Sequence, residues 1–556
     1  MTVLLSRRGL AYALVLAVAG SVLAATGDGY ALRVATLVGT YAIAAIGFQL
    51  VFGRLGLLAL SQGALFAIGA YALAMATVQG GWPPLAGLAL SVAVPALAGA
   101  LVAIPVARLD SHYVALATLG LAQLVLLAAT NLEITGGANG LYGVPPLTVL
   151  GVDVADGWRM LAVVWAGVGL ALCCFAWVTA SGRAARLATL RDAPLAALSL
   201  GLDPARARLL VFAVAGALAG LAGGFQALGL GVVSPAVARF DVMVTLLAIV
   251  VVGGRGSAWG AVIAAALLVP LPEVFRGLEQ GYLLAYGAVL LAVVVALPAG
   301  IDGVVRRFLP EAPAPTPAPK ASVPRKISVL RVERVAKRFG GVQALDGAGF
   351  DARAGEVTGI IGANGSGKTT LLNIVTGLEK ADAGVVRLDA IPLMDLAPGA
   401  RAGLGLARGF QHPEVPAGID VLAAASVAAG PACGMAALER VGLADRARAT
   451  ATSLGPAARR RLDIARALAG GPSVLLLDEP ASGLGASERA DLARLLRDLA
   501  EAGMAVVVVE HGMDFLLPIA DRLVCLEAGR VLAAGRTEEV RGDPAVIASY
   551  LGETAA

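Results

Sequence analysis

A series of long apolar runs fills the first 309 residues and restricts what this half of the chain can become. Most of these runs are long enough to cross a bilayer core of ~30 Å, which takes ~20 helical residues. We therefore expect a polytopic α-helical membrane domain with 8–10 transmembrane helices at residues 1–309. The runs lie at residues 10–26, 32–52, 57–78, 85–107, 113–130, 160–179, 209–231, 241–253, 257–272 and 282–298.

Charge is shared unevenly between the two halves of the chain. Residues 1–309 contain 16 Arg, no Lys and 11 acidic residues, whereas residues 310–556 contain 27 basic and 28 acidic residues. The net charge of +4 therefore comes from the apolar half and does not indicate a face that binds nucleic acid. With 58% hydrophobic and 15% charged residues, the chain is too apolar for an ordinary soluble protein. Membrane lipid is the expected surrounding, with no nucleic acid partner.

The arginines predict the orientation of the membrane half. With the N-terminus inside and ten crossings, twelve arginines fall inside and four outside, as the positive-inside rule requires. In one alternative, the runs 241–253 and 257–272 form a single re-entrant hairpin, which leaves eight full spans. In another, residues 10–26 are a cleaved signal peptide, which would leave an odd number of crossings. We expect an even number, with the N-terminus and the second half of the chain in the cytoplasm.

A proline- and alanine-rich stretch separates the two halves. Residues 310–326 read P-E-A-P-A-P-T-P-A-P-K-A-S-V-P-R-K and show no apolar period. Such a composition is typical of an extended linker. The sequence thus predicts a membrane domain at 1–309, a linker at 310–326 and a second domain at 327–556.

The motif G-A-N-G-S-G-K-T at residues 362–369 predicts a phosphate-binding loop. Its glycines let backbone N–H groups point at phosphate oxygens. Lys368 would reach the β- and γ-phosphates, and the Thr369 hydroxyl would ligate Mg²⁺. A buried strand at 357–361 enters the loop and a helix follows it, so the helix N-terminus lies at the nucleotide. The predicted nucleotide contacts are Gly362, Asn364, Gly365, Ser366, Gly367, Lys368, Thr369 and Thr370.

Several stretches of the membrane half resemble the permease subunit of branched-chain amino acid ABC importers. The resemblance covers most of residues 30–300, and its motifs occur in the family's order. They are Gln49 to Tyr71, Tyr113 to Gly120, Glu133 to Leu141, Ala219 to Ala227, and Val251 to Ala261. The many small residues in them allow transmembrane helices to pack closely.

Polar residues within the apolar runs have two interpretations. They line a solute path, or they hydrogen-bond neighbouring helices together. The residues concerned are Gln49, Ser61, Gln62, Gln123 and Gln226. Residues 134–143, placed outside by the arginines, are a candidate contact for a periplasmic solute-binding protein.

The cytoplasmic stretch 183–208 contains a candidate coupling helix. Permeases of this family present a short helix to their ATPase, with a pattern that resembles E-A-A-x-x-x-G. Leu195, Ala196, Ala197 and Gly201 stand at those positions, so leucine replaces the glutamate and one polar contact is lost. The resemblance implies coupling between the two domains, and a plain amphipathic surface helix is the alternative.

Residues 327–556 resemble the ATPase subunit of the same importer family, an α/β P-loop ABC domain. The resemblance implies that Phe339 stacks on adenine and that Gln411 senses Mg²⁺ and the attacking water. Asp478 and Glu479 end the strand V-L-L-L-D-E. By the same resemblance, Asp478 holds Mg²⁺ through water and Glu479 polarises the water that attacks the γ-phosphate. His511 stands at the position of the switch histidine.

One motif departs from this family's pattern. The signature, resembling L-S-x-G-Q, aligns with Leu454, Gly455, Pro456 and Ala457. Gly455 replaces the serine that grips the γ-phosphate across the ATPase dimer, unless Ser453 restores it with a shifted register. The region between Gln411 and Ser453 is also shorter than in the family, which predicts a trimmed helical subdomain.

These features predict ATP-driven import of a small polar solute across the inner membrane. Branched-chain amino acids are the leading candidates for this solute, and urea, short amides and other amino acids are the alternatives. The altered signature favours a heteromeric assembly with a sister permease, a sister ABC ATPase and a periplasmic solute-binding protein. A homodimeric exporter half-transporter and a nucleotide-gated membrane regulator with weak hydrolysis are the alternatives.

Overall fold

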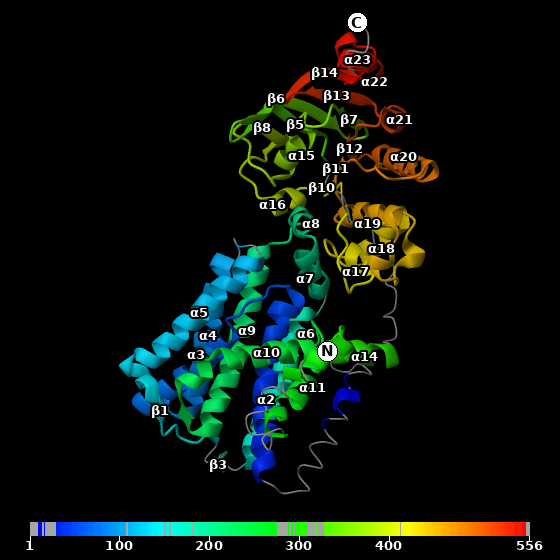
Figure 1. Ribbon diagram of the computed structural model, residues 1–556. Coiled ribbons are helices and arrows are strands. Elements are labelled where there is room, and N and C mark those ends of the chain that lie inside the picture. Colours follow the sequence, from blue (N-terminus) through cyan, green and yellow to red (C-terminus); the bar gives the residue numbers. More distant parts are fainter. Residues whose placement is uncertain are drawn as a thin grey trace. The chain divides into compact units, whose positions relative to one another are not determined.

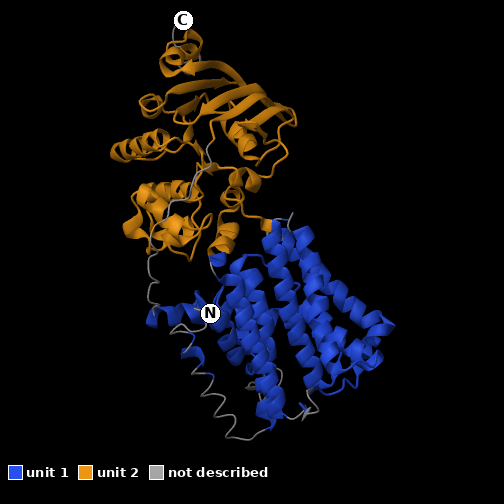
Figure 2. Cartoon of the chain, turned by 180° about the vertical axis from the view of Figure 1, so that it is seen from behind, with its two compact units in different colours: residues 1–184, 205–313 blue, residues 185–204, 314–556 orange. Residues whose placement is uncertain are grey.

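The computed structural model describes residues 9, 11–13, 16, 29–106, 109, 111–149, 152–154, 157–180, 182–274, 287–288, 291–293, 295–309, 319, 327–411 and 413–551. The chain divides into two compact units, coloured separately in Figure 2. Unit 1 comprises residues 1–184 and 205–313, and unit 2 comprises residues 185–204 and 314–556. The predicted linker lies outside the described residues apart from Pro319, so the predicted domain boundaries stay predictions.

Unit 1 is built from apolar helices, and within its described residues six of them are long and apolar enough to cross a membrane. The predicted runs at 10–26 and 282–298 lie largely outside the described residues. The long helices, labelled in Figure 1, are α2 (Gly29–Phe48, continued by the π-helix η1, Gln49–Arg54), α3 (Gln62–Ala74, continued by the π-helix η2, Met75–Gln79), α4 (Pro84–Val106), α5 (Ser111–Asn131), α6 (Gly157–Thr179) and α9 (Pro204–Leu230).

Two shorter apolar helices follow the long ones. α10 (Phe240–Gly253) has 14 residues and α11 (Ala258–Leu268) has 11, which is less than a full span for each. α10 ends at Gly254, whose φ of 97° suits glycine, and the two helices pack against each other. The two alternatives predicted from the sequence, one re-entrant hairpin or two crossings, both stay predictions.

Glycines allow α3 and α9 of unit 1 to approach each other closely. A Cβ built on Gly69 of α3 would lie 2.3 Å from the Cα of Gly220 on α9, and one on Gly223 would lie 2.0 Å from the carbonyl oxygen of Phe66. Without a hydrophobic drive between helices in lipid, such close backbone packing is what holds them together. The small-residue pattern therefore serves packing at this crossing.

Two of the intramembrane glutamines join helices through their backbones. The Nε2 of Gln49 donates to the carbonyl oxygens of Val250 and Gly254, at 3.3 and 2.9 Å, and its Oε1 accepts from the N–H of Gly256. Gln62 donates to carbonyl oxygens on α2 and α9 at 3.2 and 3.1 Å. Both side chains are buried, so they have the interhelical role that was the alternative to a solute path.

The remaining elements of unit 1 are short. Among them, β1 pairs with β4 in antiparallel fashion, and so does β2 with β3. They are β1 (Leu141–Tyr142), β2 (Thr148–Val149), β3 (Val152–Asp153), β4 (Val232–Val233), the 3₁₀ turns η3 (Glu133–Thr135), η4 (Gly137–Asn139) and η5 (Pro235–Ala238), and the helices α12 (Leu271–Val274) and α14 (Gly300–Phe308).

A six-stranded sheet forms the centre of unit 2. Its strand order is β10-β11-β12-β7-β13-β14, parallel except for the last, antiparallel pair. The strands are β7 (Val357–Ile361), β10 (Leu406–Gly409), β11 (Val474–Asp478), β12 (Ala505–Val509), β13 (Arg522–Glu527) and β14 (Arg530–Arg536).

Both faces of this sheet are buried, which explains the continuous apolar runs of its strands. Val474 and Leu476 of β11 lie in one hydrophobic core, and the alternate residues Leu475 and Leu477 lie in the other. The first core also includes the antiparallel sheet of order β6-β5-β8-β9. Its strands are β5 (Val329–Phe339), β6 (Val342–Arg353), β8 (Ala383–Leu388) and β9 (Ile391–Pro392).

Helices complete unit 2 and include a short segment from between the membrane helices. Residues 185–204, with most of α7 and all of α8, belong to this unit. The helices are α7 (Arg183–Asp192), α8 (Pro194–Ser199), α15 (Lys368–Thr376), α16 (Pro398–Gly403), α17 (Val421–Ala425), α18 (Pro431–Arg440), α19 (Pro456–Ala469), α20 (Ala486–Glu501), α21 (Met513–Leu516), α22 (Thr537–Arg541) and α23 (Pro544–Leu551), with 3₁₀ turns η7 (Ala444–Arg446) and η8 (Ala451–Ser453).

Candidate nucleotide site

The phosphate-loop residues join the buried strand β7 to helix α15, as the sequence predicts. Gly367 has a φ of 99°, and a Cβ there would lie 2.5 Å from the carbonyl oxygen of Ala344. Both constraints exclude a larger residue. Lys368 is buried, and its ammonium donates to the carbonyl oxygens of Gly362 and Ala363, each at 2.8 Å. These bonds hold the lysine across the mouth of the loop.

Burial lowers the pKa of the Lys368 ammonium, and the nearby carboxylates of Glu479 and Asp478 oppose this shift. A polyanionic ligand favours the charged form of a buried ammonium group such as this one. The other predicted loop contacts surround it: Asn364, Gly365 and Thr369 are exposed, Gly367 and Thr370 are half-buried, and Gly362 and Ser366 are buried.

Asp478 ends β11 beside the first turn of α15. Its carboxylate is 3% exposed and accepts a hydrogen bond from the Thr369 side chain. Arg408 of β10 donates to the second carboxylate oxygen at 3.2 Å. Burial raises the pKa of Asp478, while Arg408 and Thr369 pull that pKa down.

The other two predicted catalytic side chains, those of Gln411 and His511, lie close to the next residue, Glu479. Gln411 donates its Nε2 hydrogen to Oε2 of Glu479 at 2.7 Å, and Nδ1 of His511 lies 3.9 Å from the other carboxylate oxygen. Glu479 has a φ of 45°, an unusual backbone conformation for a non-glycine residue that occurs most often at functional sites. The structure thus brings together Gln411, Glu479 and His511, which are 68 and 32 residues apart in sequence.

Phe339 ends strand β5 with 46% of its surface exposed. The Lys337 ammonium lies 5.0 Å from the centre of its ring. An exposed ring can stack on a base, so its geometry is compatible with the predicted adenine contact.

Three family models match the chain. One is described as the permease component of a branched-chain amino acid transport system and matches residues 30–297. A second, described as ABC transporter, matches residues 345–482. A third, described as a branched-chain amino acid ATP-binding cassette transporter, matches residues 530–556.

Curated relatives match the second half of the chain. LivG of Salmonella typhimurium, a high-affinity branched-chain amino acid transport ATP-binding protein, is 34% identical over 250 residues, covering 40% of this chain and 98% of LivG. BraF of Pseudomonas aeruginosa, described in the same words, is also 34% identical over 250 residues with the same coverage. The chain belongs to the branched-chain amino acid ABC transporter family. The predicted family and fold class are confirmed.

This membership fixes the general activity of the chain. It is a permease fused to an ABC ATPase, it is embedded in a membrane, and it binds ATP and hydrolyses it in a cycle coupled to transport. A solved ATP-binding cassette of an ABC transporter, in its ADP conformation, is 29% identical, covers 41% of this chain and 100% of its own, and has a TM-score of 0.38.

The predicted coupling residues of the transporter lie in α8 and just after it. Ala196 and Ala197 are buried, Leu195 is 54% exposed, and Gly201 has a φ of 82°. Gly201 approaches α16 so closely that a Cβ on Gly399 would lie 3.1 Å from its Cα. Small residues here allow α8 to lie against the ATPase.

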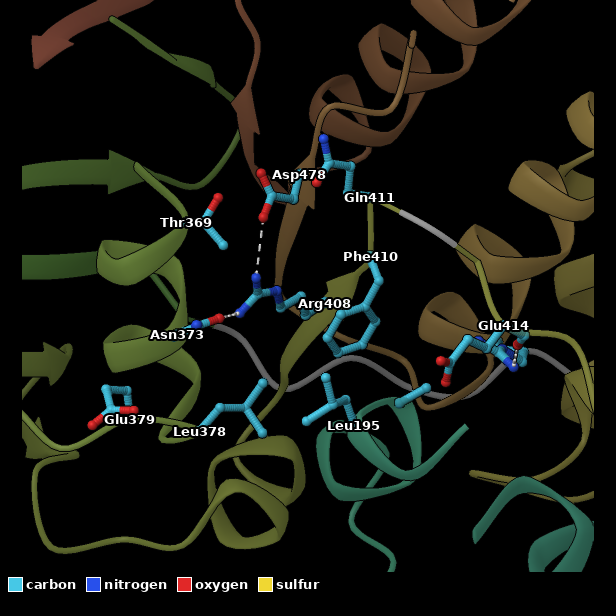
Figure 3. Close-up of a pocket in the computed structure, with 12 residues that line it drawn as sticks. Leu195, Thr369, Asn373, Leu378, Glu379, Arg408, Phe410, Gln411, Glu414 and Asp478 are labelled. Carbon is cyan, nitrogen blue, oxygen red and sulfur yellow. Dashed lines mark hydrogen bonds and ion pairs between the residues drawn. The ribbon is translucent and has the colours of Figure 1, made fainter. Parts of the chain in front are cut away.

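A cavity of about 450 Å³ connects α8 with the nucleotide site (Figure 3). Its wall includes the Mg²⁺-site candidates Thr369, Gln411 and Asp478. The complete lining is Leu195, Ala196, Thr369, Asn373, Leu378, Glu379, Arg408, Phe410, Gln411, Glu414, Arg466 and Asp478.

Asp192 in α7 supplies a polar contact to the ATPase that the sequence did not reveal. Its carboxylate accepts from the N–H of Ala417 at 2.8 Å, and Arg191 beside it donates to the carbonyl oxygen of Ala417. One turn later, Leu195 occupies the position of the family's glutamate. Asp192 thus provides an anionic contact close to the one lost at Leu195.

The altered signature lies at the N-terminus of α19. Gly455 is the N-cap residue and is exposed, Leu454 is buried, Pro456 begins the helix and Ala457 is half-buried. A Cβ on Gly455 would meet no described atom within 4 Å, so a serine would fit there. The hydroxyl of Ser453 donates to the carbonyl oxygen of Thr450 at 2.7 Å.

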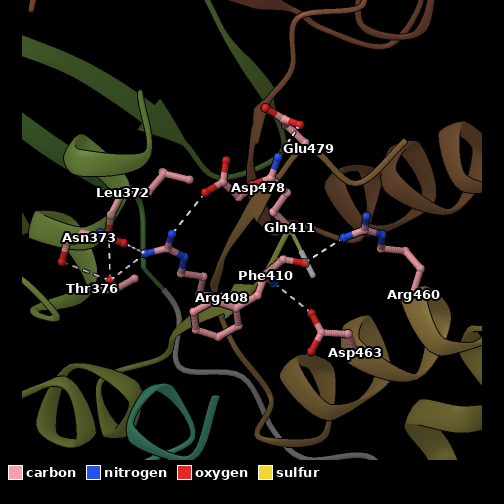
Figure 4. A network of polar contacts seen from close by, with 10 residues as sticks. All are labelled: Leu372, Asn373, Thr376, Arg408, Phe410, Gln411, Arg460, Asp463, Asp478 and Glu479. Carbon is pink, nitrogen blue, oxygen red and sulfur yellow. Dashed lines mark hydrogen bonds and ion pairs between the residues drawn. The ribbon is translucent and has the colours of Figure 1, made fainter. Parts of the chain in front are cut away.

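Helix α19 also holds the loop that carries Gln411 (Figure 4). Arg460 donates to the carbonyl oxygen of Phe410 at 2.7 Å, and the N–H of Phe410 donates to Asp463 at 2.8 Å. Arg466 donates to the carbonyl oxygen of Glu414 at 2.9 Å. The signature helix and this loop are therefore joined at three points.

Proposed function

We propose that the transporter imports a small polar solute, with branched-chain amino acids as the leading class, across the inner membrane. The observation that carries this proposal is the match of residues 30–297 to a branched-chain amino acid permease. The names of the ATP-binding relatives agree with it. The twelve arginines assigned to the inside support a cytoplasmic N-terminus and a cytoplasmic ATPase.

Mg²⁺ fits the residues at the end of β11. The Thr369 hydroxyl and the Asp478 carboxylate are hydrogen-bonded to each other and line one cavity with Gln411. They are hard oxygen donors of the kind that Mg²⁺ prefers. Thr369 would bind the ion directly and Asp478 would hold it through water. When bound, Mg²⁺ neutralises charge that develops on the β- and γ-phosphates.

The other site residues divide the work of binding and hydrolysis. The loop N–H groups and Lys368 bind the phosphates, while Phe339 stacks on the adenine. Glu479 accepts a proton from the attacking water. Gln411, whose Nε2 lies 2.7 Å from the Glu479 carboxylate, orients that carboxylate. His511 would contact the γ-phosphate.

The altered signature supports a heteromeric assembly. ABC ATPases dimerise head to tail, so the phosphate loop of one subunit meets the signature of the other. In a homodimer both sites would have Gly455 in place of serine. With a sister ABC ATPase, one site would combine Lys368 and Glu479 with an intact signature. A sister permease and a periplasmic solute-binding protein complete the proposed assembly.

Transport in reconstituted vesicles tests direction and solute together. Vesicles are prepared with the ATPase domain outside and are loaded with the binding protein and radiolabelled leucine. ATP added outside should drive the label out of the lumen, at a rate at least about tenfold that of labelled urea, ~1.4 kcal/mol in barrier height. With the label supplied outside instead, ATP-driven accumulation in the lumen would support the exporter. ATP binding without movement of any solute would support a nucleotide-gated regulator.

A further inference from the structure

Arg408 connects three parts of the nucleotide site, although no sequence motif points to it. Its Nη1 donates to Oδ1 of Asn373 at 2.5 Å and to the Thr376 hydroxyl at 3.3 Å, both on α15. Its Nη2 donates to Asp478 on β11 at 3.2 Å. Figure 4 shows the guanidinium between Asp478 on one side and Asn373 on the other. A single side chain thus ties the phosphate-loop helix to the end of β11.

The position of Arg408 in the sheet fixes this bridge. Its strand β10 runs parallel to β11, with Arg408 opposite Leu476, two residues before Asp478. The ring of Phe410 lies 5.0 Å from the guanidinium carbon. Arg408 is therefore held by its own strand while its side chain reaches across to α15.

Stability alone does not account for a buried arginine here. The side chains of Arg408 and Asp478 are 2% and 3% exposed, and Nε of Arg408 has no hydrogen-bond partner among the residues that the structure describes. Desolvating such a pair offsets much of its attraction, and apolar pairs of similar volume are often as stable. What an arginine adds is a planar fork with fixed directions for its donors.

The fork sets the orientation of the Asp478 carboxylate. One oxygen is turned toward Arg408 and the other points away from it, as Figure 3 shows. The Thr369 side chain, which begins the same helix as Asn373, also hydrogen-bonds to this carboxylate. Rotation of Asp478 is thus restrained from both sides.

We propose that Arg408 is a positioning residue that orients Asp478 and thereby sets how much Mg²⁺ strengthens ATP binding. The proposal rests on the assignment of Thr369 and Asp478 to Mg²⁺ made under the proposed function. Arg408 would act through Asp478 and not on the nucleotide or the ion directly. The hydrogen bond from Arg408 to Asn373 keeps the Asp478 carboxylate in a fixed position relative to α15, the helix that carries Lys368 and Thr369.

The test compares the affinity of the full-length protein for a non-hydrolysable ATP analogue in Mg²⁺ and in EDTA. In Arg408→Lys, the ammonium cannot hold Asn373 and Asp478 at once. The ratio of the two affinities should fall about fivefold or more, while the affinity in EDTA stays within about twofold. A ratio equal to that of the wild type would show that Arg408 is only structural and would overturn the proposal.

A second variant keeps the test valid if Arg408→Lys does not fold. Asn373→Ala preserves the buried ion pair and removes the shorter of the two hydrogen bonds that tie Arg408 to α15, leaving the one to Thr376. It should lower the same ratio by about two- to threefold, since the guanidinium retains Asp478 but loses its register with the helix. An unchanged ratio in this variant would also contradict the proposal.

Arg401 of α16 provides a matched control, because it is a buried arginine that also donates to α15. It is 3% exposed and donates to the carbonyl oxygens of Ile374 and Val375 in α15, at 2.6 and 2.8 Å. Arg401→Lys should leave the Mg²⁺ ratio unchanged, because the hydrogen bonds of Arg401 within the described residues go to backbone carbonyl oxygens and not to Asp478. If Arg401→Lys lowered the ratio as much as Arg408→Lys, general loosening of α15 would explain both, and the positioning role would be refuted.

Asp478→Asn separates this inference from the assignment on which it rests. It should reduce the ratio at least as much as Arg408→Lys does, because it removes the carboxylate that would hold the ion through water. If Asp478→Asn left the ratio unchanged, the assignment of Asp478 to Mg²⁺ would be wrong. If Asp478→Asn lowered the ratio and Arg408→Lys did not, the assignment would stand and only the role of Arg408 would fail.

Discussion

At the scale of single residues, the proposed nucleotide site has separate groups for binding ATP and for hydrolysing it. Lys368 is held over the loop by two carbonyl oxygens, and Glu479 is contacted by Gln411 and lies 3.9 Å from His511. Removal of a binding group should weaken ATP affinity, whereas removal of the base should spare it.

Lys368→Ala should weaken nucleotide binding by about tenfold or more, ~1.4 kcal/mol, because it removes the only charge that the loop itself directs at the phosphates. Equilibrium binding of a fluorescent ATP analogue measures this loss. Lys380→Ala, at an exposed position after α15, is the control and should bind normally. Unchanged affinity in Lys368→Ala would show that this lysine does not contact the phosphates.

Glu510→Gln should stabilise the protein at neutral pH. Glu510 is buried and accepts the N–H of Ala481 at 2.8 Å, and burial raises its pKa in the folded state. A raised pKa means that the folded state binds a proton more tightly, so the charged form costs stability above that pKa. Glutamine keeps the acceptor without the charge. Its thermal midpoint should exceed that of the wild type at pH 8, and the difference should shrink as pH falls.

A midpoint for Glu510→Gln below that of the wild type at pH 8 would contradict this argument. Glu510→Ala is the comparison, since it leaves the N–H of Ala481 without its acceptor. That variant should lose about 1–3 kcal/mol.

Sequence motifs revealed the residues whose chemistry is local and missed those that act across elements. The phosphate loop and the D-E pair could be predicted because each is a short run with a fixed spacing. Arg408 could not, because its partners Asn373 and Asp478 are 35 and 70 residues away. The one available signal was a charged residue in a strand that is buried along its whole length.

At the scale of elements, α7 and α8 connect the permease sequence to the ATPase. The alanines of the predicted coupling helix are buried and its terminal glycine approaches α16. Sequence comparison showed that the family's glutamate is missing at Leu195. It could not show that Asp192 makes an anionic contact one turn earlier, because the group it binds is a backbone N–H, which leaves no mark in the sequence.

Asp192→Asn should uncouple transport from hydrolysis. The amide is a weaker acceptor than the carboxylate for the N–H of Ala417 and no longer pairs with Arg191. We expect the number of ATP molecules hydrolysed per solute transported to rise about threefold or more, a free-energy change of ~0.7 kcal/mol. Asp395→Asn, an exposed carboxylate in the same unit, should leave that ratio unchanged. An unaltered ratio in Asp192→Asn would exclude a coupling role for this contact.

At the scale of the whole molecule, one chain supplies one permease and one ATPase with a weak signature. The sequence predicted the membrane half, the ATPase half and the family, and these agree with the helices, sheets and comparisons. The number of spans did not follow from the sequence, because α10 and α11 are too short for composition alone to separate a hairpin from two crossings. The proposed heteromeric assembly could not be derived from the fold of this one chain.

Restoring the signature tests whether this chain uses its own. Gly455→Ser with Ala457→Gly should change transport by the heteromeric assembly by less than about twofold, since the productive site uses the partner's signature. In a homodimer, the same pair should raise the ATPase rate by about tenfold or more, ~1.4 kcal/mol for one recovered phosphate contact. A purified homodimer that hydrolyses ATP rapidly without any partner would contradict the heteromeric proposal.

The most direct test of the account exchanges the catalytic glutamate in one ATPase at a time. Glu479→Gln in this chain should leave ATP binding intact and abolish ATP-driven movement of leucine in reconstituted vesicles, because it removes the base of the one site with a complete set of groups. The equivalent change in the sister ATPase should retain at least about half of the transport rate, since that site already faces Gly455. Transport within twofold of the wild type in Glu479→Gln, or equal loss from both changes, would contradict the account.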